Sequence, residues 1–475
     1  MPASTSGQRL RVLWLSTIAF TLMFAVWLML GMLSIPISKE LGLSDSQLYW
    51  LALTAILAGS VLRFNFGVWT DKYGGRLMMT VLLLAAVVPT FLVSRIGDYT
   101  QLLVCAALFG VAGNSFTVGI AWNAAWYPKE RQGLALGVFG AGNVGASVTK
   151  LVGPLLIAVV PASGFFDGMV PGGWRFIPVA YGVLLVAMAA AVWFLAPRQD
   201  RCPGRGKSFA EMSAPLKYRR VWEYSLHYVV VFGAYVALSG VLPKYYYANY
   251  GADLAQSLGL SEQLVADFPR IKTMQGEEYK EYLKANPVVA SDLKTLMMAI
   301  GWLAGFCYVF PASLLRPLGG WLSDRFGAKV VMSSVYAAMV VAGLALSLPL
   351  GLDVWGFTAA LFVLGAGMGI GKASVYKLIP DSFPNDIGAV GGLVGMLGAL
   401  GGVLIPLGVV PLQGLTGIPQ MLFAVLLGLT VLAAAWFQAE QWLHQGVGTG
   451  SATTGAIHGE QRIASRQAIS FEVEA

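Results

Sequence analysis

Long apolar runs leave this chain few ways to fold. Crossing about 30 Å of hydrocarbon takes about 20 helical residues, and only helices or closed barrels satisfy their backbones there. Runs such as "VLWLSTIAFTLMFAVWLMLGML" lack the alternation of barrel strands. We therefore predict an all-α integral membrane protein with twelve transmembrane helices. The runs lie at approximately residues 13–37, 47–69, 77–95, 101–126, 133–160, 175–196, 223–243, 296–319, 329–350, 355–379, 388–411 and 418–440.

Composition agrees with a protein that lives in lipid. Only 12% of the 475 residues are charged, whereas a soluble domain carries about 25%. The three cysteines form no CxxC pair, so the sequence indicates neither a disulfide framework nor a zinc site. We predict no metal and no cofactor. No constellation of nucleophile, metal or cofactor indicates an enzyme.

Basic residues set the predicted orientation. They gather before the first run, in the short loops after the second and eighth runs, and in the linker "APRQDRCPGRGKSFAEMSAPLKYRR". The positive-inside rule puts these segments, and both termini, in the cytoplasm. We expect a multi-pass protein of the cell (inner) membrane. The net charge of +7 then reflects topology and contact with lipid headgroups, and we expect no nucleic-acid partner.

A sequence echo divides the chain into two halves. The stretch "SVLRFNFGVWTDKYGGR" recurs as "SLLRPLGGWLSDRFGAK", so that Arg63 and Arg316 occupy equivalent positions 253 residues apart. Transporters are commonly built from such repeats, with the substrate held where they meet. We predict a six-helix bundle at 1–196, a basic cytoplasmic linker at 197–222, a second bundle at 223–440 with an outer insertion at 245–292, and a disordered cytoplasmic tail at 441–475.

The echoed loops read G-x-x-x-D-[KR]-x-G-x-[KR]. They resemble the signature loop of the major facilitator superfamily, at the two places where that superfamily has it. A carboxylate beside helix ends and basic side chains can form a polar latch that opens as the halves rock. The predicted gating residues are Asp71, Arg76, Asp324 and Lys329.

Arg63 and Arg316 are the candidate functional residues. An arginine facing lipid near a helix centre costs anywhere from about 3 to over 10 kcal/mol. Each could instead snorkel to the surface, but Arg63 lies eight residues, about 12 Å of helix, before Asp71. The first six runs contain no Asp or Glu to pair with it. We therefore predict an anion site, and the flat guanidinium fork favours a planar oxyanion such as nitrate or nitrite.

Two glycine-rich helices support a close-packed site, because bare backbone can approach a ligand closely. The stretches "AWYPKERQGLALGVFGAGNVGAS" and "GAVGGLVGMLGALGGVLIP" resemble the two signatures of the NarK-type nitrate/nitrite porter family. The resemblance covers nearly the whole chain and implies nitrate and nitrite as substrates. It implies paired binding arginines at Arg63 and Arg316, whereas each aromatic taken alone also fits ordinary packing. The other residues that it implies are Phe24, Phe116, Asn143, Tyr228 and Phe232, with Gly140, Gly142, Gly398 and Gly401 as bare backbone.

Uptake of an anion into a negative interior is opposed by about 2.3 kcal/mol per charge per 100 mV. Exchange for nitrite would offset this cost, and so would symport with protons. Lys372 and Lys150 are charges within predicted helices. We hypothesise that Lys372 is uncharged in the empty site and takes up a proton when the anion binds; alternatively, it only pairs with backbone carbonyls. The stretch "GKASVYKLIP" is more similar to the symporting branch of the family.

The sequence thus predicts a monomeric nitrate/proton symporter that works by alternating access within the lipid bilayer. A nitrate/nitrite antiporter is the alternative. A facilitator for another small anion, or for a sugar or drug, is a more distant one.

Overall fold

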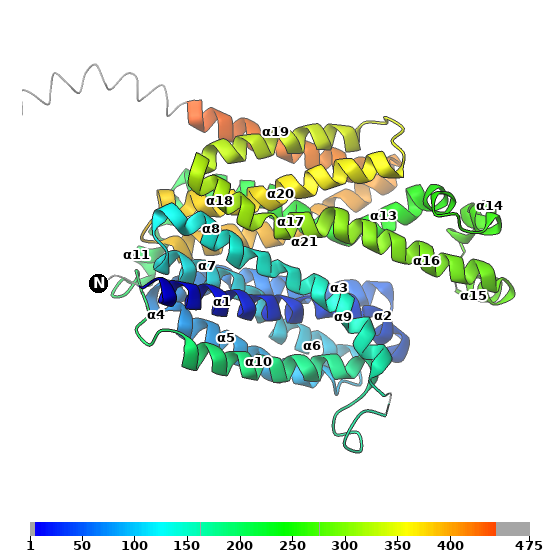
Figure 1. Cartoon of the computed structure of the whole chain (residues 1–475), viewed down its shortest axis with the longest axis horizontal. Helices are drawn as coiled ribbons and strands as arrows, with labels where there is room; N and C mark the ends of the chain where they lie inside the picture. The colour runs from blue at the N-terminus through cyan, green and yellow to red at the C-terminus, as the bar shows by residue number, and fades with distance from the viewer. Residues whose placement is uncertain (1–4, 162, 275, 443–475) are drawn as a thin grey trace, which may run out of the picture.

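A computed structural model describes residues 5–161, 163–274 and 276–442. These residues form helices and no strand, apart from an isolated bridge between Phe165 and Val170. The helices run nearly parallel, with the blue-to-cyan first half on one side and the green-to-orange second half on the other (Figure 1). The prediction of an all-α fold is confirmed.

Each predicted run of the first half is helical. The elements are α1 (Ser6–Trp27), α2 (Met29–Leu41), α3 (Asp45–Val61), α4 (Arg63–Tyr73), α5 (Gly75–Val93), α6 (Tyr99–Gly110), the 3₁₀ turn η1 (Val111–Asn114), α7 (Ser115–Trp126), α8 (Lys129–Gly140), the 3₁₀ turn η2 (Ala141–Val144), α9 (Gly145–Val159), the 3₁₀ turn η3 (Gly173–Arg175) and α10 (Phe176–Leu195).

The second half follows a short linker helix, α11 (Phe209–Ser213), and the 3₁₀ turn η4 (Ala214–Lys217). Its elements are α12 (Arg219–Tyr228), the π-helical turn η5 (Val229–Gly233), α13 (Ala234–Ser257), α14 (Glu262–Ile271), α15 (Gly276–Ala285), α16 (Pro287–Ala304), the π-helical turn η6 (Gly305–Val309), α17 (Phe310–Leu314), α18 (Arg316–Phe326), α19 (Ala328–Ser347), α20 (Val354–Ser382), α21 (Ile387–Thr416) and a last helix at Met421–Trp442.

Eleven helices of the described residues are long and apolar enough to cross a membrane. The fifth predicted run, 133–160, is not among these eleven but is helical as α8, η2 and α9. The insertion predicted at 245–292 contains α14 and α15, and α13 and α16 extend past the bundle to reach them (Figure 1). Residues 443–475 of the predicted tail lie outside the described residues. The boundaries of the two halves stay a prediction.

The two arginine-bearing helices break at equivalent points. Leu62 separates α3 from α4 with φ −84° and ψ −2°, and Leu315 separates α17 from α18 with φ −82° and ψ 0°. Proline occupies the first turn of α18 at Pro317, but α4 has Phe64 there. Proline is therefore not required for the break. In both halves the helix breaks at the leucine directly before the arginine, so the arginine begins a new helical segment.

The two halves meet closely at the end of the bundle where α4 joins α5 and α18 joins α19, which we call the loop end. Here α4 packs along α21, and α8 packs along α18. The backbones of Gly67 and Gly388 touch, as do those of Gly133 and Gly320, leaving no space for a Cβ atom on any of the four. The loop end is closed in this structure.

Both signature aspartates reach across this contact. The carboxylate of Asp71 accepts a hydrogen bond of 2.9 Å from the backbone N–H of Gly388, at the start of α21. The carboxylate of Asp324 accepts bonds from the N–H groups of Gly133 and Leu134 in α8, at 2.9 and 2.8 Å, and pairs with Lys377 at 3.2 Å. Each half therefore holds a helix of the other half by a carboxylate.

The other two predicted gating residues do not cross between the halves in this way. Arg76 donates to the carbonyls of Trp193 and Arg198, near the end of α10. Lys329 is exposed and lines a small cavity with Glu223. The two aspartates alone among the four predicted residues contact the opposite half through the bonds described.

The central linker is fastened to both halves. The N–H of Gly204 donates to the carbonyl of Asp71 at 2.9 Å, and Lys207 forms an ion pair with Asp386 at 2.9 Å. The Met212 side chain is fully buried in a cluster with Val68 of α4 and Ala389 of α21. The linker thus braces the closed loop end.

At the opposite end, Glu40 fastens α2 to η3. Its carboxylate accepts bonds from the Arg175 guanidinium at 2.7 Å and from the Trp174 indole at 2.6 Å. The hydrogen bond from Arg175 lowers the pKa of Glu40. These bonds hold α2 and η3 together within the first half.

We predict that Asp324→Asn opens the loop end. Asparagine keeps an acceptor but loses the charge, and neutral hydrogen bonds are roughly half as strong as charge-assisted ones. We expect the population open at the loop end to rise about tenfold, which corresponds to about 1.4 kcal/mol. The measurement is the distance distribution between spin labels at Tyr73 and Phe326, which are exposed on opposite halves.

The matched control is Asp353→Asn. Asp353 caps the start of α20 by accepting from Gly356 at 2.9 Å, and asparagine caps a helix equally well. This control should leave the distances unchanged. Equal distributions for Asp324→Asn and the parent protein would contradict a latch at Asp324.

Candidate functional site

Arg63 lies fully buried between the two halves. Its Nε donates to the carbonyl of Gly59 in α3 at 2.9 Å, and its Nη1 donates to the carbonyl of Gly395 in α21 at 2.9 Å. Its Nη2 is buried and has no hydrogen-bond partner. One guanidinium therefore binds both halves and keeps one donor group free.

Arg316 is also fully buried, and it is less satisfied than Arg63. Its Nε and Nη1 have no hydrogen-bond partner. Its guanidinium faces α8 of the first half, where a Cβ atom on Gly140 would lie 2.5 Å from the Cζ atom. Glycine at this position is what lets the arginine lie against the backbone.

The ring of Phe116 lies near both guanidinium groups. The Cζ atom of Arg63 is 5.6 Å from the ring centroid, and that of Arg316 is 5.3 Å from it. Both distances allow cation–π attraction, which strengthens away from water. The ring of Phe116 is also nearly parallel to the rings of Tyr228 and Phe232, at interplanar angles of 13° and 4°. These residues, predicted separately, form one aromatic wall.

Two further aromatics belong to this wall and were missed from the sequence. Tyr376 of α20 meets Phe116 and Tyr228 edge-on, at 5.2 and 4.8 Å between ring centroids, and its hydroxyl donates to the carbonyl of Gly391. Trp27 lies 5.2 Å from the Cζ of Arg63. Tyr376 stands in the stretch "GKASVYKLIP" and Trp27 in "FAVW". Both stretches are notable in the sequence, but the sequence did not indicate which of their residues face the site.

Phe24 and two of the predicted glycines lie one layer back. Phe24 packs edge-on against Phe20 and Trp27, and it is Phe20 whose ring meets Phe116, at 5.5 Å. Gly142 abuts Phe20, and Gly401 abuts Val229. These residues support the aromatic wall from behind.

Gly398 and Asn143 have different surroundings. Gly398 lies against the ring of Tyr228, which leaves no room for a larger residue. Asn143 follows Gly140 by three residues in η2 and is buried, and neither atom of its side-chain amide has a hydrogen-bond partner. The amide is thus an unsatisfied polar group within the segment that follows the Arg316 contact.

Unsatisfied buried polar atoms therefore gather at this site. In native structures such groups are rare, and each calls for an explanation such as an absent ion. Within the described ranges, no ion pair joins Arg63 or Arg316 to a carboxylate. The atoms without a partner are Nη2 of Arg63, Nε and Nη1 of Arg316, both amide atoms of Asn143 and the hydroxyl of Tyr228.

Comparison with known proteins agrees with this architecture. Residues 15–264 and 284–456 match the family model of the Major Facilitator Superfamily. The chain belongs to this superfamily. The prediction of a transporter fold rather than an enzyme is thereby confirmed.

Individual relatives place the chain within the superfamily. It is 51% identical over 446 residues to "Probable nitrate/nitrite antiporter NarK1" of Thermus thermophilus, covering 90% of this chain and 91% of the relative. It is 27% identical to "Nitrite extrusion protein" of Bacillus subtilis, covering 81% and 82%. The chain is thus a NarK-type member of the Major Facilitator Superfamily.

A solved structure supports the fold alone. The superfamily transporter FucP, in the outward conformation, has a TM-score of 0.61 and 15% identity to this chain, covering 89% of it and 98% of FucP.

Lys372 lies behind the aromatic wall of this superfamily member. It is fully buried, and its Nζ donates to the carbonyl of Ala312 at 3.0 Å. The Nζ lies 3.1 Å from the centroid of the Tyr235 ring and 5.6 Å from that of Phe232. The carbonyl contact is the one that the structural alternative for Lys372 predicted. The side chain of Lys150 lies outside the described residues.

Metal binding finds no support in the part of the chain that the structure describes. It holds no group of three or more His, Cys, Asp or Glu side chains that could bind a metal ion.

We predict that Gly140→Ala destabilises the protein. The added methyl group would clash with the Arg316 guanidinium, and overpacking of this kind costs about 1–3 kcal/mol. The measurement is the apparent Tm of the purified protein in detergent. Gly240→Ala is the matched control, because a Cβ there meets nothing within 4 Å. A Tm that falls no further for Gly140→Ala than for Gly240→Ala would contradict the close approach.

Proposed function

We propose that this protein carries nitrate and nitrite across the cell membrane by alternating access, binding the anion between Arg63 and Arg316. The observation that carries the proposal is the pair of fully buried guanidinium groups with free donors and no carboxylate partner. A buried charge left without a counter-ion is strongly destabilising. An anion that enters the site supplies that counter-ion.

The chemistry of the site favours a small, flat oxyanion. Guanidinium donates in a planar fork that matches a trigonal oxyanion, whereas lysine would act as a point charge. The rings of Phe116, Tyr228 and Phe232 are nearly parallel to one another. In this proposal the aromatic wall limits the thickness of the ligand, Asn143 supplies a polar contact, and Gly140 and Gly398 allow the arginine and the wall to close in. Phe24, Gly142 and Gly401 support the aromatic wall from the side away from the ligand.

The names of relatives support nitrate and nitrite in particular. The relative that is 51% identical is named a probable nitrate/nitrite antiporter, and the Bacillus subtilis relative is named for nitrite extrusion. Those names describe those proteins. We extend their substrates to this chain because the two arginines provide the chemistry that such substrates need.

Alternating access follows from the latches. The loop end is held by Asp71 and Asp324, each bonded to backbone N–H groups of the other half. Release of an anion through this end requires these bonds to break, and both are remade when the halves rock back. In this proposal the loop end and both termini lie in the cytoplasm of a protein of the inner membrane, and the basic loops support that orientation.

For the driving force we propose symport with protons. Lys372 is a buried lysine whose helix, α20, also carries Tyr376 of the wall. A proton taken up by Lys372 would then accompany the anion. Antiport of nitrate against nitrite is the second candidate, and the name of the Thermus thermophilus relative favours it. In that case the bond from Lys372 to Ala312 is its whole role.

We predict that Arg63→Lys lowers the affinity for nitrate by about 10- to 100-fold, because one or more charge-assisted hydrogen bonds of about 1.5–3 kcal/mol are lost. Lysine cannot bond Gly59, Gly395 and an anion in the same fork. Calorimetric titration of purified protein with nitrate measures the affinity. The control is Arg11→Lys, because Arg11 bonds only the Leu195 carbonyl at an exposed position among its described hydrogen bonds. Unchanged affinity in folded Arg63→Lys would refute the site.

The driving force is tested by flux in proteoliposomes. We expect an inward proton gradient to accelerate nitrate uptake without nitrite inside, and we expect Lys372→Gln to remove that acceleration while nitrate counterflow continues. Uptake that needs internal nitrite and ignores the proton gradient would make the protein an antiporter. Full proton dependence in Lys372→Gln would exclude Lys372 as the coupling residue. Absence of any flux would refute the substrate assignment.

A further inference from the structure

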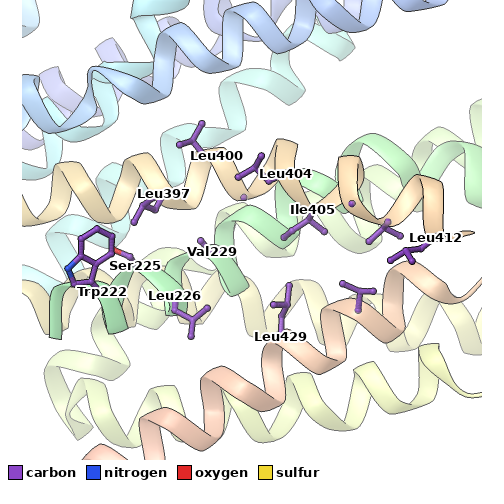
Figure 2. A pocket seen from close by; sticks show the side chains of 14 residues that line it. Trp222, Ser225, Leu226, Val229, Leu397, Leu400, Leu404, Ile405, Leu412 and Leu429 are labelled. Atoms are coloured by element: carbon purple, nitrogen blue, oxygen red, sulfur yellow. The ribbon is translucent and has the colours of Figure 1, made fainter. Parts of the chain in front are cut away.

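A groove of about 500 Å³ lies away from the arginines, between α12, α21 and the last helix. Figure 2 shows side chains from these helices lining it along its length. Its lining includes Trp222 and Leu226 from α12, Leu397, Leu404 and Leu412 from α21, and Leu429 from the last helix.

The lining excludes a role in anion passage. Ser225 contributes a hydroxyl, but that hydroxyl already donates to the carbonyl of Val221 at 2.8 Å. Apart from Ser225 and the indole of Trp222, the side chains that line the groove are apolar. A groove of this kind suits a hydrocarbon chain.

The length of the groove fits a lipid acyl chain. Leu397 and Leu412 are fifteen residues apart on one helix, which is about 22 Å at 1.5 Å per residue. One leaflet is about half of the 30 Å hydrocarbon core. A whole acyl chain can therefore lie along α21 within the groove.

Basic residues stand at the loop end of the groove. Arg219 precedes Trp222, Leu226 and Val229 at spacings of three and four residues, so it continues the same face of the helix. Its side chain is 67% exposed and lies over the ring of Trp436, with the Cζ 5.3 Å from the centroid. Lys217 is exposed just before it. Trp222 is half exposed, as tryptophans at a membrane interface commonly are.

The charge at this end is positive even after its one described ion pair. Arg219 pairs with Glu440 at 3.0 Å, which offsets one positive charge. Lys217 directly follows Leu216, whose carbonyl accepts a hydrogen bond of 3.0 Å from the indole of Trp222, so Lys217 adds a further positive charge beside the mouth of the groove. Phosphate groups of anionic lipids are attracted to such juxtamembrane basic residues.

We propose that this groove binds an anionic phospholipid, with an acyl chain along α21 and the headgroup phosphate at Arg219 and Lys217. The apolar length accounts for the chain, and the excess positive charge accounts for a headgroup with net negative charge. A zwitterionic headgroup gains less from the same residues, because its own cation faces them.

The lipid would lie directly behind the helices that carry the anion site. Gly401 in the groove abuts Val229, and Val229 follows Tyr228 of the aromatic wall. The ring of Tyr228 in turn rests on Gly398 of α21. An acyl chain in the groove would therefore contact both α21 and η5, which carry the aromatic wall and the glycines behind it. This site is independent of the transported substrate.

The test uses purified full-length protein reconstituted in vesicles of phosphatidylcholine with phosphatidylglycerol. Native mass spectrometry after mild extraction counts the lipids that stay bound. We expect the parent protein to retain phosphatidylglycerol about fivefold over phosphatidylcholine, from the attraction of one basic residue. We expect Gly408→Leu to lose both lipids, since a Cβ at Gly408 meets nothing within 4 Å and the leucine fills the groove.

Two further variants complete the test. Gly240→Leu is the matched control, because its Cβ is equally free and Gly240 does not line the groove; it should behave as the parent. Arg219→Gln, at an exposed position, should retain both lipids equally. Phosphatidylglycerol retained by Gly408→Leu as by the parent would overturn the proposal. Equal retention of the two lipids by the parent, or a dimer that closes the groove, would also overturn it.

Discussion

Two guanidinium groups, buried without carboxylates, are the constraint that the rest of this structure serves. Their charge cannot be left to lipid, so the surrounding helices supply carbonyls and aromatic faces instead. Gly59 and Gly395 hold Arg63, and the ring of Phe116 lies near both arginines. The glycines of α8 and α21 follow from the same need, because side chains there would push the arginine and Tyr228 away. After this support, Nη2 of Arg63 and Nε and Nη1 of Arg316 still have no hydrogen-bond partner, and it is on these donors that the proposed anion site depends.

The duplication makes the two halves similar but not equivalent. Both break a helix at a leucine before the arginine, and both send an aspartate to the helix of the other half. Yet Arg63 has carbonyl partners on both sides, whereas two of the nitrogen atoms of Arg316 have none. Arg316 is therefore the less restrained of the pair. The asymmetry leaves Arg63 bonded to both halves in this closed structure and leaves two nitrogen atoms of Arg316 without a hydrogen-bond partner.

The fold was predictable from the sequence because apolar runs and a repeat at a fixed offset can be recognised without any knowledge of packing. The burial of Arg63 and Arg316 was predictable for the same reason, since depth along a helix can be counted. The direction in which each side chain points around its helix could not be derived in this way. Phe24 was therefore chosen where Phe20 makes the contact, and Tyr376 and Trp27 were missed. The ordered linker was also missed, because Met212 is buried only by contacts distant in sequence.

The bond between Arg63 and Gly395 joins residues that lie 332 positions apart in the chain. At about 5–20 residues per second, a ribosome needs roughly 15 to 70 seconds to make the intervening segment. Throughout that interval Arg63 is already in a finished helix and lacks its second carbonyl. The newly synthesised first half thus contains a cation that lacks one of its two hydrogen-bond acceptors until α21 has been made. Maturation of the arginine pair is for this reason a late event of biogenesis, set by the synthesis of α21.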